Sequence, residues 1–148
     1  MIKLSQRNAL WATVKMLPSI LTIGRYGCTT TCISMLSDYF KCFVSPRAMV
    51  DYNVKYTKDG LIIWGLINFP NFKFEKRLHG WNTVEIDISL KDPKKAVILE
   101  VANGSHWVVA TRKIPFTKHY FIVDPWTGKS STTMAYKNVT GSAHFIAK

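Results

Sequence analysis

Two periodicities of apolar residues divide the chain into an N-terminal and a C-terminal half. From 28 to 40 the apolar positions recur at helical spacing and predict an amphipathic helix. Ser45 followed by Pro46 is a helix start signal, so a second helix is expected over 46–56, and 60–68 predict a third short one. The segment before them, 5–15, predicts a short helical or irregular stretch anchored by Trp11.

After Pro70 the pattern changes to alternation with a period of two, which is typical of strands. The expected strands are 72–78, 83–90, 94–102, 106–112 and 119–124, with "HFIA" at 144–147 as a last edge strand. Helices followed by strands predict an α+β fold, in which N-terminal helices pack on a C-terminal antiparallel sheet. A chain of 148 residues fits one such domain, 1–148.

Composition indicates a folded globule. Hydrophobic residues make up 47% of the chain and the mean hydropathy is +0.02, which excludes a disordered protein. The longest apolar stretch, 60–69, is too short to cross a bilayer and contains Asn68, so no membrane span is expected. Residues 1–15 lack a continuous apolar segment. We therefore expect no signal peptide and a protein that is cytoplasmic as synthesised.

The net charge of +11 is unevenly distributed. Residues 1–58 hold eight Lys or Arg against two acids, and 106–148 hold six against one, so both ends of the chain are basic. Such surfaces suit an anionic cell-wall polymer, a nucleic acid or a membrane surface. A solvated basic surface without a specific partner is the alternative, because no run of five basic residues occurs.

Three residues suggest nucleophilic chemistry. Cys28 follows Gly27 at the predicted start of a helix, where unpaired N–H groups and the helix dipole favour the thiolate. A hairpin turn centred near residue 115 would place His106 directly opposite Asp124. A thiol, an imidazole and a carboxylate form the set required for covalent acyl transfer. The alternative is that Cys28 packs as a small buried side chain.

The remaining cysteines and histidines carry weaker signals. A zinc site that combines Cys32, Cys42 and a histidine is conceivable, but the chain lacks a paired C-x2-C and we expect no metal and no cofactor. With an odd count of three, the cysteines do not form a disulfide framework and fit a reducing compartment. The other histidines are expected to be surface or internally satisfied groups: His79, His119 and His144.

Several segments together resemble a known family. The stretches "SQRNALWA", "TIGRYGCTTTCISML", "ANGSHWVVATR" and "YFIVDPWTG" resemble the C39-like, papain-fold cysteine peptidases that are common in bacteriophage and bacterial genomes. The likeness runs from Ser5 to about Gly128 and keeps the order glutamine, cysteine, histidine, aspartate. It implies a papain-like fold with Cys28 as nucleophile, His106 as general base, Asp124 as orienting carboxylate and Gln6 as oxyanion donor.

The resemblance also implies an activity. It is that of a cysteine peptidase or amidase that cleaves a peptide or peptidoglycan amide bond, with a virion-associated or lytic role at the cell wall. Threonines at 29–31 and Ser105 depart from the usual residues of the family, which affects the expected fit of the substrate more than the chemistry. The competing hypothesis is a catalytically silent papain-fold module that binds partners in a larger assembly such as a virion.

Overall fold

The computed structural model describes the backbone of residues 1–148 and all side chains except those of 52 and 53. Its centre is a six-stranded sheet in the order β1-β6-β2-β3-β4-β5, and every neighbouring pair is antiparallel. The strands are β1 (Phe72–His79), β2 (Lys95–Val101), β3 (His106–Lys113), β4 (Tyr120–Asp124), β5 (Lys129–Thr132) and β6 (Val139–Ala147).

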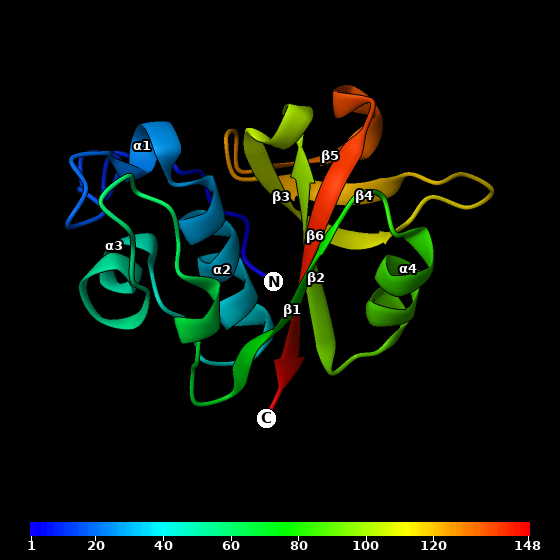
Figure 1. The fold of residues 1–148 in the computed structure, drawn as a ribbon, viewed down its shortest axis with the longest axis horizontal. Helices are drawn as coiled ribbons and strands as arrows, with labels where there is room; N and C mark the ends of the chain where they lie inside the picture. Colours follow the sequence, from blue (N-terminus) through cyan, green and yellow to red (C-terminus); the bar gives the residue numbers. More distant parts are fainter.

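Helices lie on both sides of this sheet. Figure 1 shows the N-terminal helices on one side and α4 on the other, with the sheet seen nearly edge-on between them. In chain order they are α1 (Ile23–Tyr26), α2 (Cys28–Tyr39), α3 (Pro46–Ala48), the π-helix η1 (Met49–Asn53), the 3-10 helix η2 (Trp64–Leu66), α4 (Thr83–Lys91), and the 3-10 helices η3 (Ala102–Gly104) and η4 (Thr133–Tyr136). No described helix is long and apolar enough to span a bilayer.

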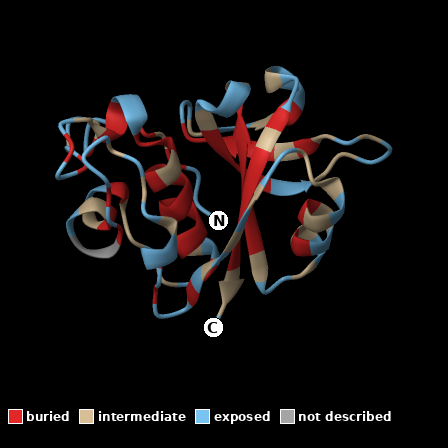
Figure 2. Ribbon diagram, viewed as in Figure 1, coloured by how far each residue is buried: buried red, intermediate tan, exposed pale blue. Residues whose placement is uncertain are grey.

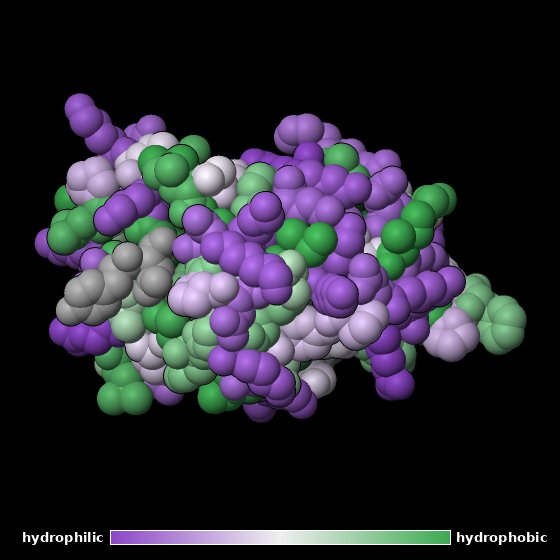
Figure 3. Space-filling view, turned by 90° about the horizontal axis from the view of Figure 1, so that it is seen from below, coloured by the Kyte–Doolittle hydropathy of each residue, from purple (hydrophilic) through white to green (hydrophobic). Residues whose placement is uncertain are grey.

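Each face of the sheet buries its own apolar core. Because successive side chains of a strand point to opposite faces, Ile98 of β2 packs toward α2 whereas Val97 and Leu99 pack toward α4. Figure 2 shows buried residues along α2, along the central strands and on the inner side of α4. On the face shown in Figure 3 hydrophilic side chains predominate, with apolar ones between them.

The structure confirms most of the expected order. The helix over 28–40 is α2, and helices followed by an antiparallel sheet give the expected α+β class. The segment 5–15 forms turns, in which the buried Trp11 donates from Nε1 to the carbonyl of Ser5 at 2.9 Å. The helix expected over 46–56 ends at residue 53, and within 60–68 only the single turn of η2 is helical.

The strand predicted over 83–90 is wrong, because this segment is the helix α4. The four alternating apolar residues of this segment also form two pairs at i, i+4, the spacing of neighbours on one face of a helix. The helix turns Ile86 and Leu90 toward the sheet and leaves Val84 and Ile88 exposed. The segment lies between Asn82 and Pro93, which are start and stop signals for a helix.

The last strand was also misplaced by the sequence pattern. β6 is not at an edge but lies between β1 and β2, and the edges are β1 and β5. Seen in Figure 1, β6 runs beside β2 through the middle of the sheet. Its position agrees with the burial of Ser142 and His144, two polar residues that have no exposed surface.

Candidate functional site

The first element of the site is the turn that leads into α2. A Cβ at position 27 would lie 2.6 Å from the carbonyl oxygen of Ile23, so only glycine allows α1 and α2 to follow one another this closely. Cys28 is therefore the first residue of α2, where the N–H groups of the first turn have no helical partners. Its side chain is 9% exposed and lines a cleft.

The second element is the β3–β4 hairpin, which supplies the histidine and the carboxylate. His106 begins β3 and Asp124 ends β4, and His106 Nε2 lies 2.8 Å from Asp124 Oδ1. The predicted register, in which His106 lies opposite Asp124, is off by two residues, because the observed ladder pairs Val109 with Val123 and Ala110 with Ile122. His106 and Asp124 are therefore not a directly opposed pair of the ladder. Their side chains meet beyond its last paired residues.

Asp124 is a strongly anchored carboxylate. Its Oδ1 accepts from His106 and from the backbone N–H of Trp126 at 2.9 Å, and its Oδ2 accepts from the hydroxyl of Tyr136. Burial alone would raise the pKa of Asp124, but these donors lower it below the usual value. The carboxylate is therefore charged near neutral pH.

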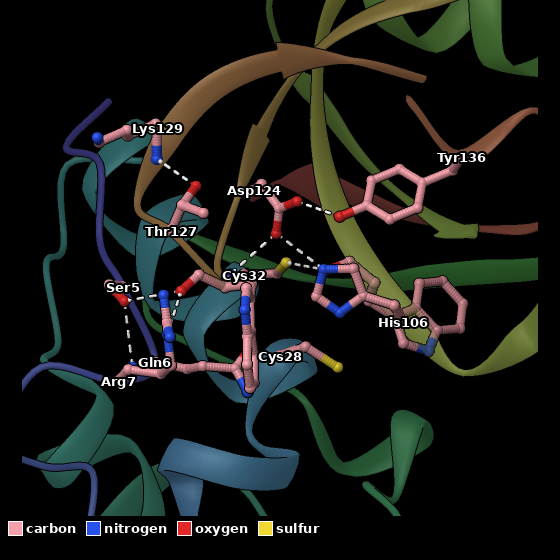
Figure 4. A network of polar contacts seen from close by, with 12 residues as sticks. Ser5, Gln6, Arg7, Cys28, Cys32, His106, Asp124, Thr127, Lys129 and Tyr136 are labelled. Atoms are coloured by element: carbon pink, nitrogen blue, oxygen red, sulfur yellow. Dashed lines mark hydrogen bonds and ion pairs between the residues drawn. The ribbon is translucent and has the colours of Figure 1, made fainter. Parts of the chain in front are cut away.

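His106 is held in its cationic form by its neighbours. Burial lowers the pKa of His106, whereas hydrogen bonds to the Asp124 carboxylate and to Cys28 raise it, and the result is a pKa of about 9. Because Nε2 faces Asp124, the other ring nitrogen is available to the sulfur. Figure 4 shows the Cys28 side chain beside the His106 ring. The arrangement places a cationic imidazole beside a cysteine sulfur, as a thiol nucleophile requires.

Gln6 is brought to the site by contacts with the segment that follows Asp124. Its backbone N–H donates to the carbonyl of Pro125 at 2.7 Å. The buried side chain donates from Nε2 to the carbonyls of Ile23 and Gly24 at 3.4 and 3.3 Å, just before Cys28. Its Oε1 has no hydrogen-bond partner among the side chains that the structure describes. The structure thus places Gln6 against the turn that precedes Cys28, and its role as an oxyanion donor stays a prediction.

A cleft of about 540 Å³ runs past Cys28. One wall comes from the N-terminal part of the chain and includes Tyr26 and Leu61, and the other comes from the end of the sheet. At the sheet wall Arg77 donates to Glu100 at 2.8 Å, and its guanidinium lies over the rings of Trp64 and Trp107. The cleft therefore combines aromatic surface with a fixed ion pair.

Sequence reasoning missed two of these groups. Tyr136 and the Arg77–Glu100 pair belong to no recognisable motif, and each makes its contact with a residue distant in the chain. In the sequence, the one indication is the spacing: Tyr136 follows Asp124 by 12 residues, which is enough chain for one short strand to bring it back to Asp124.

The other candidates are structural. Cys32 is fully buried, and burial, together with the nearby Cys28 and Asp124, raises the pKa of its thiol. His119 and His144 have hydroxyl partners. Within the part of the chain whose side chains are described, no three His, Cys, Asp or Glu residues gather closely enough to hold a metal ion.

The two tryptophans beside the pair differ in their surroundings. Trp107 is buried and packs against Trp64, with ring centroids 5.1 Å apart. The ring of Trp126 is 42% exposed and lies under the guanidinium of Arg7 at 4.5 Å. Trp107 is therefore a core aromatic that also lines the cleft, and Trp126 contributes its backbone N–H to Asp124.

Comparison with known proteins agrees with this geometry. No curated protein and no solved structure matches the chain. The family model described as the Peptidase C39 family matches residues 17–140, a span that contains Cys28, His106 and Asp124. Membership implies a cysteine peptidase, and the α+β architecture is consistent with the papain-like fold. The chain belongs to the peptidase C39 family.

Proposed function

We propose that the chain is a cysteine peptidase or amidase in which Cys28 is the nucleophile, His106 the acid–base group and Asp124 the orienting carboxylate. The observation that supports this most strongly is the hydrogen-bonded His106–Asp124 pair beside a cysteine at a helix N-terminus. The three groups come from separate elements, α2, β3 and β4, and Cys28 lines the cleft.

The proposed reaction has two steps. The Cys28 thiolate attacks the carbonyl carbon of the amide, and the resulting oxyanion accepts from the backbone N–H of Cys28 and from the Gln6 amide. The C–N bond breaks as the imidazolium of His106 gives its proton to the leaving amine. Water then gives a proton to His106 and attacks the thioester, which releases the carboxylic acid and regenerates the thiolate–imidazolium pair.

The substrate is a peptide or a peptidoglycan amide bond. The cleft volume is within the range of specific ligand sites. The net charge of +11 favours binding to an anionic cell-wall polymer. Nucleic acid is the alternative anionic polymer that this charge would bind. On this proposal the protein reaches the cell wall either as part of a virion or during lysis. In the first case the virion is a further binding partner.

Selective labelling of the three thiols tests the chemistry without a known substrate. At neutral pH, iodoacetamide should modify Cys28 at least tenfold faster than Cys32 or Cys42, because burial raises the pKa of both other thiols. Peptide mass mapping identifies the modified residue. Cys28→Ala should remove the fast phase, and Cys32→Ala should keep it.

Hydrolysis is then measured on a peptide panel and on purified peptidoglycan. The parent protein and Cys32→Ala should release new amino groups, and Cys28→Ala should release none. Slow and equal labelling of all three thiols, without hydrolysis, would contradict the enzyme and favour a silent papain-fold binding module.

A further inference from the structure

The Asp124 carboxylate is held on two sides by different kinds of donor. Oδ1 accepts from His106 and from the Trp126 backbone, both of which come from the hairpin and the segment directly after it. Oδ2 accepts from the hydroxyl of Tyr136, its one hydrogen-bond donor in the described part of the chain. The orientation of the carboxylate plane therefore depends on a residue outside the set expected from the sequence.

Tyr136 is itself fixed in place. It ends η4, and its half-buried ring packs against the apolar core on the α4 side of the sheet. At the start of η4 the buried Thr133 accepts from the backbone N–H of Tyr120 at 3.0 Å and bonds His119 at 3.0 Å. The Tyr136 ring also lies 5.6 Å from the His106 ring, centroid to centroid. Figure 4 shows its hydroxyl directed at Asp124.

We infer that Tyr136 is a positioning residue of the proposed reaction: its hydroxyl fixes Oδ2 of Asp124, so that Oδ1 stays directed at His106 Nε2 and the other ring nitrogen stays directed at Cys28. The inference rests on the proposed function for its catalytic meaning. The coupling from Tyr136 through Asp124 to His106 can be measured whether or not the protein hydrolyses any substrate.

The hydroxyl has two opposing effects on His106. As a donor it draws charge from the carboxylate, which lowers the pKa of His106. As an anchor it keeps the carboxylate in the orientation that raises the pKa of His106. The titratable groups that face the pair are Cys28 and Cys32 from α2 and Tyr136 from η4. Burial and Asp124 both raise the pKa of Tyr136, so its hydroxyl remains a proton donor throughout the working range.

The test compares two variants that each remove one tyrosine hydroxyl from a tyrosine–aspartate hydrogen bond. Tyr136→Phe removes the anchor of Asp124. Tyr120→Phe removes the matching bond to Asp87, 2.7 Å long, on the α4 side of the sheet. The titration of His106 is followed by NMR from pH 5 to 10, and the alkylation rate of Cys28 by iodoacetamide is measured at pH 7.

In Tyr136→Phe we expect His106 to titrate at lower pH than in the parent, and Cys28 alkylation at pH 7 to slow about tenfold, the scale of one hydrogen bond to a charged group. Tyr120→Phe should change neither quantity. Thermal unfolding of both variants shows that any difference is not a general loss of structure.

Two outcomes overturn the inference. An unchanged His106 titration in Tyr136→Phe shows that Trp126 and the hairpin hold Asp124 without the hydroxyl. A shift of the titration to higher pH shows that the hydroxyl only draws charge from Asp124. A failure of the proposed function looks different, because there the parent protein already shows slow, unselective labelling of Cys28.

Discussion

Two histidines that are largely withdrawn from water, the buried His144 and the half-buried His106, have opposite charge preferences. His144 lies under α4, where Ser89 contacts its Nδ1 at 2.8 Å and Ser142 its Nε2 at 2.9 Å. Burial, with a smaller effect of Lys76, lowers the pKa of His144 to about 4. Burial also lowers the pKa of His106, but the Asp124 carboxylate and Cys28 outweigh it and raise the value to about 9. The charge of the partner decides the outcome, since both rings are withdrawn from water.

The largest expected effect removes the charged partner. Asp124→Ala should lower the pKa of His106 from about 9 toward the ordinary 6.5, because burial lowers this pKa and only Cys28 still raises it. A fall from about 9 to 6.5 is a change of about three-hundredfold in the protonation equilibrium, and NMR titration measures it. Asp124→Asn keeps an acceptor without the charge and should fall between the two. A pKa that stays near 9 in Asp124→Ala would remove Asp124 from the site.

The next prediction separates the turnover rate from the protonation of His106. Gln6→Ala should lower kcat about a hundredfold with little change in KM, because one donor to the oxyanion is lost. The His106 titration should not move, since Gln6 bonds Ile23 and Gly24 and not the imidazole. Gln6→Glu, which has nearly the same shape but no N–H, should behave like the alanine variant. Steady-state kinetics on a cleaved peptide provide the measurement. An unchanged kcat would show that the oxyanion donor lies elsewhere.

The two histidines should also give the stability opposite slopes with pH. The folded pKa of His106 is raised, so its contribution is complete below the unfolded value of about 6.5 and is lost as the pH rises toward about 9. The folded pKa of His144 is lowered, so its contribution is complete above about 6.5 and is lost as the pH falls toward about 4.

Each slope approaches about 1.4 kcal/mol of unfolding free energy per pH unit. Urea denaturation from pH 4 to 9 measures the two limbs. His144→Gln should flatten the acid limb relative to the parent, and His106→Gln should flatten the alkaline one. Parallel curves for the parent and both variants would contradict the assigned directions.

The smallest expected effect concerns His144 alone. Ser142→Ala leaves a buried nitrogen of His144 without its partner and should cost about 1 kcal/mol of unfolding free energy. The alkylation rate of Cys28 should not change, because this serine contacts no group of the site. Slower alkylation in Ser142→Ala would mean that the two histidines are coupled through the sheet.

Local signals were sufficient to predict that Cys28 begins a helix. Gly27 and Cys28 are adjacent in the chain, and the helical spacing after them is strong. His106 and Asp124 lie at the ends of two strands that a short hairpin joins, so even a register off by two residues brought them together. To predict that these two side chains meet, it is therefore enough to know that His106 begins one strand and Asp124 ends the other.

The contacts that could not be predicted join distant residues. Tyr136 meets Asp124, and Arg77 of β1 reaches Glu100 of β2 across β6. No local period encodes the insertion of β6 between those strands. The error over 83–90 has another origin, because the same alternation suits a strand and a helix, and only packing against the sheet distinguishes them.

The position of β6 has a consequence for the order of folding. β6 follows every other strand in the chain, yet β1 has β6 as its one strand neighbour. During synthesis the strands from β2 to β5 can pair before β6 emerges, whereas β1 must wait for it. Without β6 a gap of about 10 Å, two inter-strand spacings, separates β1 from β2. Arg77 is carried by β1, so its part of the cleft wall is assembled last, after the elements that carry Cys28, His106 and Asp124. Such late, non-local pairing slows folding and leaves the cleft incomplete until β6 is inserted.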